Sequence, residues 1–152
     1  MIRILFICHG NICRSPMAEF VCKELVRRTG QEADFDIRSA ATSTEEIGRD
    51  IHPGTKRKLS AMGIPFTKRQ AVQVRSSDYT RYDWLIVMDH HNLTNLRRIF
   101  PQDSDHKIRL LLSYTGQERD IADPWYTGDF DATYADILAG CTALLQTLSP
   151  VD

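Results

Sequence analysis

The stretch Ile-Arg-Ile-Leu-Phe-Ile-Cys-His-Gly-Asn-Ile-Cys-Arg-Ser-Pro, residues 2–16, decides the fold of this chain. Its first part, residues 2–7, is apolar and rich in isoleucine, which is typical of a strand buried on both faces. A loop that contains a glycine follows, and Ser15-Pro16 then predicts a helix start, with the serine as N-cap and the proline as first helical residue. A strand, a loop and a helix in this order predict the opening of a βαβ unit.

The alternation of strands and helices continues along the chain. A helix is predicted over 15–28, because small and apolar residues recur there at helical spacing. The further elements expected are strands at 35–39, 82–88 and 107–112, and helices at 53–62, 90–100 and 131–148. Such alternation predicts a parallel sheet covered on both faces. We therefore expect an α/β protein, with residues 1–152 as a single domain.

Composition excludes some classes of partner. With 42% hydrophobic residues, 26% charged residues and a net charge of -1, the chain has no overall field that would attract nucleic acid or an anionic membrane. The apolar run at 1–7 is too short for a signal peptide, and no run approaches the roughly 20 apolar residues of a membrane span. We expect a cytoplasmic protein whose cysteines (Cys8, Cys13, Cys22 and Cys141) are reduced thiols.

The loop at 8–15 contains a cysteine and an arginine separated by five residues, at the carboxyl end of the first strand. Ligands bind at such strand ends in parallel sheets, and loop amides beside a helix N-terminus make an anion-binding nest. The Arg14 guanidinium would grip two phosphate oxygens. The same positive environment favours the thiolate of Cys8, which is then suited to attack phosphorus and form a phosphocysteine.

The other loop residues fit this interpretation. Gly10 allows close approach of the backbone, Asn11 tolerates left-handed geometry or shapes the loop by hydrogen bonds, and Ser15 can donate to the Cys8 sulfur. The remaining members of the predicted phosphate-binding loop are His9, Ile12 and Cys13. The alternative, a core cysteine followed by a solvated arginine, leaves this combination unexplained.

Hydrolysis of an aryl phosphate also needs a proton donor for the leaving phenolate and a base for water. Asp123, on the loop Asp123-Pro124-Trp125-Tyr126, is the best candidate, because parallel topology brings this loop to the edge of the sheet that carries Cys8. Trp125 and Tyr126 would form the walls of a slot for a flat ring.

These motifs resemble the low-molecular-weight protein tyrosine phosphatase family. The resemblance is carried by residues 8–16, 39–42, 88–93 and 123–126, in order along the whole chain. It implies a four-stranded parallel sheet flanked by helices in a three-layer sandwich, for which we predict the flavodoxin-like strand order 2-1-3-4. It also implies hydrolysis of phosphotyrosine without cofactor or metal, with Cys8 as nucleophile, Arg14 as phosphoryl clamp and Asp123 as general acid and base. Asn11, Ser15 and Ser39 match the hydrogen-bond network that shapes the loop.

The resemblance carries further expectations. Partners would be proteins that contain phosphotyrosine, such as a tyrosine kinase or its targets, and the enzyme would be a monomer or a weak dimer. Cys13 matches a cysteine that can form a reversible disulfide with the nucleophile, which would make the enzyme redox-sensitive; simple packing is the other reading, and both stay open. Cys22 and Cys141 are expected in the core.

The sequence departs from the family pattern at a few positions. His9 replaces an apolar or small residue; it would either add a titratable group at the mouth of the pocket or point to solvent, and solvent is favoured. Glu45 replaces a wall aromatic, so one wall is expected to be weak or acidic. Ile12 stands where a threonine marks members that act on phosphoarginine, which disfavours that substrate. Asp89 is expected to cap the helix at 90–100 or to brace a neighbouring loop.

The basic residues and most histidines lie outside these motifs. The basic residues are interpreted as a solvated helix face: Lys56, Arg57, Lys58, Lys68 and Arg69. The histidines outside the loop lack ligand spacing, so no metal site is expected.

The sequence disfavours three alternative functions. A thiol-coupled arsenate reductase needs further cysteines on a mobile segment, whereas residues 23–140 contain none. A phosphoprotein-binding module needs neither the nucleophile Cys8 nor the acid Asp123. A metal site built on Cys8 and Cys13 lacks the partners that would complete a tetrahedral shell.

Overall fold

The computed structural model describes residues 1–148, and it confirms the α/β class with a four-stranded, all-parallel sheet in the order β2-β1-β3-β4. The strands are β1 (Ile2–Cys8), β2 (Phe35–Ala41), β3 (Trp84–Val87) and β4 (Ile108–Leu110). The helices are α1 (Arg14–Arg28), α2 (Pro53–Ala61), α3 (Asp78–Arg81), α4 (His90–Ile99), α5 (Pro124–Thr127) and α6 (Phe130–Leu148). Two short 3₁₀ helices, η1 (Glu32–Asp34) and η2 (Leu111–Thr115), complete the elements.

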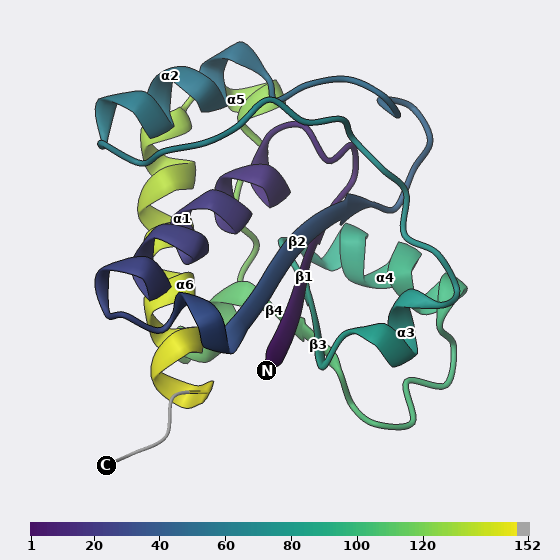
Figure 1. Ribbon diagram of the computed structural model, residues 1–152. Helices are drawn as coiled ribbons and strands as arrows, with labels where there is room; N and C mark the ends of the chain where they lie inside the picture. Colours follow the sequence, from purple (N-terminus) through teal and green to yellow (C-terminus); the bar gives the residue numbers. More distant parts are fainter. Residues whose placement is uncertain (149–152) are drawn as a thin grey trace.

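The central strand β1 is buried on both faces, as its apolar run predicts. Ile4 and Phe6 point into a core shared with α1 and α6, whereas Leu5 and Ile7 point into a second core shared with α4. Figure 1 shows the resulting layers, with α1, α2 and α6 on one side of the sheet and α3 and α4 on the other. Burial of both faces makes β1 a rigid support for the loop that follows it.

The strand order places a topological switch point at β1, because β2 pairs with one of its edges and β3 with the other. The connections that leave β1 and β3 therefore diverge from neighbouring strand ends, and a crevice opens between them. Cys8 ends β1, and Asp89 lies two residues beyond the end of β3. Both residues thus lie at the edge of the sheet where α/β proteins bind ligands.

Some predicted boundaries were wrong. The strand expected at 107–112 is only Ile108–Leu110, because Leu111 turns into η2 and packs against Gly140 of α6, where a Cβ atom would lie 2.5 Å from the Leu111 Cγ. The strand expected at 82–88 is only Trp84–Val87, since Tyr82 ends α3. The end of β4 thus depends on tertiary packing, which a local pattern does not contain, whereas the start of β3 is set by the short helix before it.

The start of α1 also differs from the prediction. The helix begins at Arg14 with Cys13 as the preceding residue, so Ser15 is a residue of the first turn and not the N-cap. The prediction for α2 is confirmed, since Pro53 occupies the first turn and Gly63 follows the helix with a φ of 69°. Among residues 1–148, no helix is both long and apolar enough to cross a bilayer.

Candidate active site

The loop between β1 and α1 folds around the sulfur of Cys8. Cys8 is 3% exposed, and the backbone N–H of Asn11 donates to its Sγ over 3.3 Å. Asn11 adopts a φ of 60°, the left-handed conformation that asparagine tolerates better than most residues. This single residue turns the chain back toward α1, so that its amide faces the sulfur.

A chain of buried side chains fixes the conformation of Asn11. Its Nδ2 donates to the hydroxyls of Ser15, at 2.8 Å, and Ser39, at 2.9 Å. The Ser39 hydroxyl donates in turn to Glu19, a buried carboxylate of α1. The backbone N–H of Val72 donates to Asn11 Oδ1 over 3.2 Å. Strand β2, helix α1 and the segment before α3 thus all hold one loop residue.

Ser15 is placed to stabilise a thiolate on Cys8. Its Oγ lies 3.0 Å from the Cys8 Sγ. As a thiol, Cys8 donates to this oxygen; an ionised sulfur has no proton to donate, and the Ser15 hydroxyl then lies within reach to donate to it. The contact between Ser15 and Cys8 that the sequence predicts is therefore present, with the serine inside the helix.

Arg14 lies under the pocket with 2% of its surface exposed. Its Nη1 donates to Asp89 Oδ2 over 2.7 Å and to the carbonyl oxygen of Ile121 over 2.8 Å. Burial lowers the pKa of this guanidinium, but the charges of Cys8, Asp89 and Asp123 outweigh that effect and raise it. The cation is thus permanently charged and held in one orientation.

Asp123 reaches the same place from the other end of the chain. It caps the short helix α5, where its Oδ1 accepts from the Trp125 backbone N–H over 3.0 Å. Its Oδ2 lies 3.5 Å from the Arg14 Nη2. The loop before it is tied to the sheet, because the Ile121 N–H donates to the carbonyl of Met88 just beyond β3. The carboxylate is therefore fixed beside the guanidinium.

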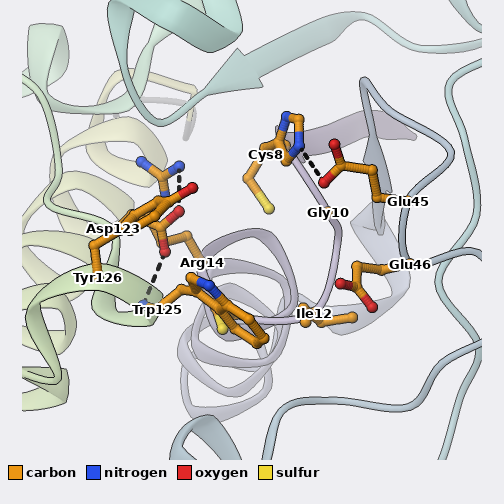
Figure 2. A pocket seen from close by; sticks show the side chains of 11 residues that line it. Cys8, Gly10, Ile12, Arg14, Glu45, Glu46, Asp123, Trp125 and Tyr126 are labelled. Atoms are coloured by element: carbon orange, nitrogen blue, oxygen red, sulfur yellow. Dashed lines mark hydrogen bonds and ion pairs between the residues drawn. The ribbon is translucent and has the colours of Figure 1, made fainter.

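Most of the predicted site residues line one pocket that is open to solvent. In Figure 2, Trp125 and Tyr126 stand on one side together with Asp123 and Arg14, Glu45 and Glu46 stand on the opposite side, and Cys8 lies between them. The predicted residues that line the pocket are Cys8, His9, Gly10, Ile12, Cys13, Arg14, Asp123, Trp125 and Tyr126. Asn11, Ser15 and Ser39 are buried and support the loop through hydrogen bonds.

Of the two positions expected for His9, the structure shows the one at the mouth of the pocket, with the side chain 36% exposed. Its Nε2 lies 2.9 Å from Glu45 Oε2, and its ring stacks on that of His91 with centroids 6.3 Å apart. The two departures from the family pattern thus contact each other at the mouth of the pocket. The expectation of an acidic wall is confirmed, since Glu45 and Glu46 both line the pocket.

Cys13 lies in the pocket lining as a free thiol that is 5% exposed. Burial, together with the charges of Cys8 and Asp123, raises the pKa of this thiol to about 12. Cys13 is therefore a protonated thiol at neutral pH, whereas the sequence predicts a thiolate for Cys8. Cys22 and Cys141 lie in the core between α1 and α6, as expected.

Several supporting residues were missed or misread from the sequence. Asp89 caps α4 as predicted, but its bond to Arg14 was not foreseen. Arg69 is not on a solvated helix face: it is half-buried on a segment without helix, and its guanidinium donates to the carbonyl of Asn11. Glu19 was overlooked, although a carboxylate on the apolar face of α1, one turn after Ser15, was a usable signal.

From the sequence, His52 was noted only as a histidine without metal-ligand spacing. In the structure it contacts Gly54, Trp125 and Phe130. Its Nδ1 accepts from the Gly54 N–H and so caps α2, while its ring packs against those of Trp125 and Phe130 with centroids 5.6 Å apart in each case. The sequence offered no signal for this packing, which joins segments about 70 residues apart.

The fold and the pocket together define a class of protein: a parallel α/β protein whose loop between the first strand and the first helix folds around a buried cysteine sulfur beside a buried arginine. Comparison with known proteins specifies the class. Residues 3–150 match the model of the family described as "Low molecular weight phosphotyrosine protein phosphatase". The chain belongs to this family, whose members are hydrolases.

Individual relatives agree with this assignment. The chain is 37% identical to the low molecular weight protein-tyrosine-phosphatase YfkJ of Bacillus subtilis, covering 97% of this chain and 96% of the relative. It is 41% identical to the low molecular weight phosphotyrosine protein phosphatase of Schizosaccharomyces pombe, covering 84% and 83%. The crystal structure of YfkJ superposes with a TM-score of 0.93 over 97% of this chain and 94% of that one. The crystal structure of SP-PTP from Streptococcus pyogenes, which is 38% identical in sequence, superposes with a TM-score of 0.89 over 99% of this chain and 95% of that one.

Proposed function

We propose that this protein removes phosphate from phosphotyrosine in proteins, and from small aryl phosphates, through a phosphocysteine on Cys8. One observation carries the proposal: the sulfur of Cys8, the guanidinium of Arg14 and the carboxylate of Asp123 converge on one pocket. These are the nucleophile, the phosphoryl clamp and the proton donor that hydrolysis of an aryl phosphate needs. Family membership supports the same reaction.

In the first step the Cys8 thiolate attacks phosphorus. The S–P bond forms while the P–O bond to tyrosine breaks, and Asp123 in its acid form gives a proton to the departing phenolate oxygen. Arg14 binds the phosphoryl oxygens and stabilises the charge that they carry in the transition state. The support is geometric, because the Arg14 Nη2 lies 3.5 Å from the Asp123 Oδ2, so a phosphoryl group bound to the arginine is next to the acid.

In the second step water replaces the sulfur. The water oxygen bonds to phosphorus, its proton passes to the Asp123 carboxylate, and the S–P bond breaks to return the thiolate. The Asn11 amide and the Ser15 hydroxyl, 3.3 and 3.0 Å from the sulfur, stabilise this leaving thiolate. Inorganic phosphate then leaves, and Asp123 is protonated again for the next turnover.

The shape of the pocket supports an aromatic substrate. Trp125 is 55% exposed and Tyr126 is 83% exposed, so both rings are free to contact a phosphotyrosine ring above Cys8. Burial of large aromatic surface at an exposed site stabilises a complex with another flat ring. The Ile12 side chain lines the same pocket and offers no polar group to an alternative substrate such as phosphoarginine.

Hydrolysis of p-nitrophenyl phosphate and of a phosphotyrosine peptide, with a chelator present, tests the proposal. We expect activity on both, little on the matched phosphoserine peptide, and a loss of at least about a thousandfold in Cys8→Ser. A Cys8→Ser protein with full activity would reject the mechanism. Thiol oxidation that depends on arsenate, measured in parallel, would favour the reductase instead.

A further inference from the structure

The two sides of the pocket differ in charge. Trp125 and Tyr126 form an uncharged aromatic side, whereas Glu45 and Glu46 form the side that faces them (Figure 2). Asp123 adds a further carboxylate, and the Arg14 guanidinium lies buried below, where it is bound by Asp89. The cation therefore serves the phosphoryl group, and the rim that meets the rest of a substrate is acidic.

Glu45 is the carboxylate that a substrate reaches. Its side chain is 66% exposed, whereas that of Glu46 is 20% exposed and pairs with Arg49 over 3.0 Å. The loop that carries Glu45 is tied to the phosphate-binding loop, because the Ser43 N–H and hydroxyl both donate to the carbonyl of His9. The charge of Glu45 is thus held at a fixed place relative to the nucleophile.

The contacts of Glu45 leave its carboxylate accessible. Among residues 1–148, its ion-pair contact is the His9 Nε2, which lies 2.9 Å from the Glu45 Oε2, and no Lys or Arg pairs with it. A cationic side chain of a bound peptide therefore meets a carboxylate that no Lys or Arg in this range already occupies.

We propose that Glu45 determines sequence specificity, so that the enzyme prefers phosphotyrosine flanked by Lys or Arg over phosphotyrosine flanked by Asp or Glu. This inference rests on the proposed function and specifies its substrate class. With the phosphoryl group on the loop and the ring between the two walls, a flanking side chain lies at the rim. A cation there pairs with Glu45, and an anion is repelled by it. Because Glu45 is exposed, the preference is modest, about threefold to tenfold between the two charges.

Three phosphotyrosine peptides of equal length test the proposal, with Lys, Gln or Glu on both sides of the phosphotyrosine. The kcat/KM is measured from released phosphate for the wild type, Glu45→Gln and Glu45→Lys, and for Glu118→Gln as a matched control. Glu118 is exposed and lies outside the pocket. We expect the order Lys, Gln, Glu in the wild type and in the control, a flattened order in Glu45→Gln, and a reversed order in Glu45→Lys. The wild-type preference should shrink at high salt.

The possible failures are distinguishable. Equal kcat/KM on the three peptides in the wild type, with normal hydrolysis of p-nitrophenyl phosphate, would overturn the specificity proposal alone. A Glu45→Lys variant that keeps the wild-type order of the three peptides would also overturn the specificity proposal. Absence of hydrolysis of p-nitrophenyl phosphate and of all peptides would reject the proposed function, and the specificity proposal with it.

Discussion

Arg14 Nη1 lies 2.7 Å from Asp89 Oδ2, so the carboxylate that caps α4 also orients the guanidinium at the base of the pocket. This contact joins the connection after β1 to the connection after β3, and it lies at the switch point of the sheet. The arginine is 2% exposed and needs such a partner, because a buried charge without compensation is costly. If Arg14 binds the phosphoryl group as proposed, Asp89 is a positioning residue for it.

Replacement of Asp89 separates its two roles. In Asp89→Asn the side chain still caps α4 through the Asn92 N–H, but the charge opposite Arg14 is lost. We expect kcat/KM to fall by about tenfold to a hundredfold, with a loss of stability of about 1–3 kcal/mol, because the buried guanidinium loses one carboxylate partner and keeps only Asp123. Asp89→Ala should lose about 1 kcal/mol more, because the cap is also gone. Steady-state kinetics and urea unfolding measure both effects; unchanged kinetics in Asp89→Asn would contradict the positioning role.

Replacement of Asp123 should affect substrates according to their leaving group. In Asp123→Ala the phenolate of tyrosine leaves without a proton, so we expect kcat for a phosphotyrosine peptide to fall by about a hundredfold to ten thousandfold. p-Nitrophenolate is a much weaker base and needs less help, so formation of the phosphoenzyme from p-nitrophenyl phosphate should slow far less. Pre-steady-state kinetics with both substrates checks this difference. Equal losses would show that Asp123 does not protonate the leaving group.

The cysteines should differ sharply in reactivity. Burial raises the pKa of the Cys13 thiol to about 12, and burial also raises the pKa of Cys141 well above its ordinary value. Since the thiolate is the reactive form, both should resist iodoacetate near neutral pH, and only Cys8 in the anion-binding loop should be alkylated. Peptide mapping by mass spectrometry identifies the labelled residue, and inorganic phosphate should protect it. Rapid labelling of Cys13 in the folded protein would count against this description.

The contribution of Asp50, in the loop before α2, to the stability of the protein should depend on pH. The hydrogen bond from Lys56 lowers the pKa of Asp50 to about 2, helped by the backbone N–H groups of Ile51 and Arg69. A lowered pKa means that this stabilisation is present above the unfolded value near 4 and is lost as pH falls toward 2. Asp50→Asn should therefore unfold at lower urea concentration than the wild type at pH 7, with a smaller difference at pH 3. A difference that is constant over this range would contradict the assignment.

How much of the site could be predicted depended on whether its signals were local. Cys8, Gly10, Asn11 and Arg14 lie within one short loop, so their spacing at a strand end was enough to indicate an anion site. Asp123 followed from parallel topology, which brings later loops to the same edge of the sheet. Glu19, Asp89 and Arg69 act through contacts between distant segments, and their partners are not encoded by spacing along the chain.

The fold shows the same limit. The two-sided covering followed from alternating strands and helices, and the strand order from the resemblance to the family, but the end of β4 did not, because it depends on Leu111 packing against Gly140 of α6. The contact of His9 with Glu45 was not predicted for a similar reason, since Glu45 belongs to a loop after β2. In each case the local pattern was correct, and a contact made only in the folded molecule decided the outcome.

Capture of the covalent intermediate tests the central claim most directly. Asp123→Ala, mixed with p-nitrophenyl phosphate and quenched with denaturant, should accumulate phosphoenzyme, because the second step lacks its base while the first needs little acid. We predict that the intact protein gains the mass of one phosphoryl group and that peptide mapping places this group on Cys8. Steady release of p-nitrophenol with the phosphoryl group on another residue, or on none, would contradict the account.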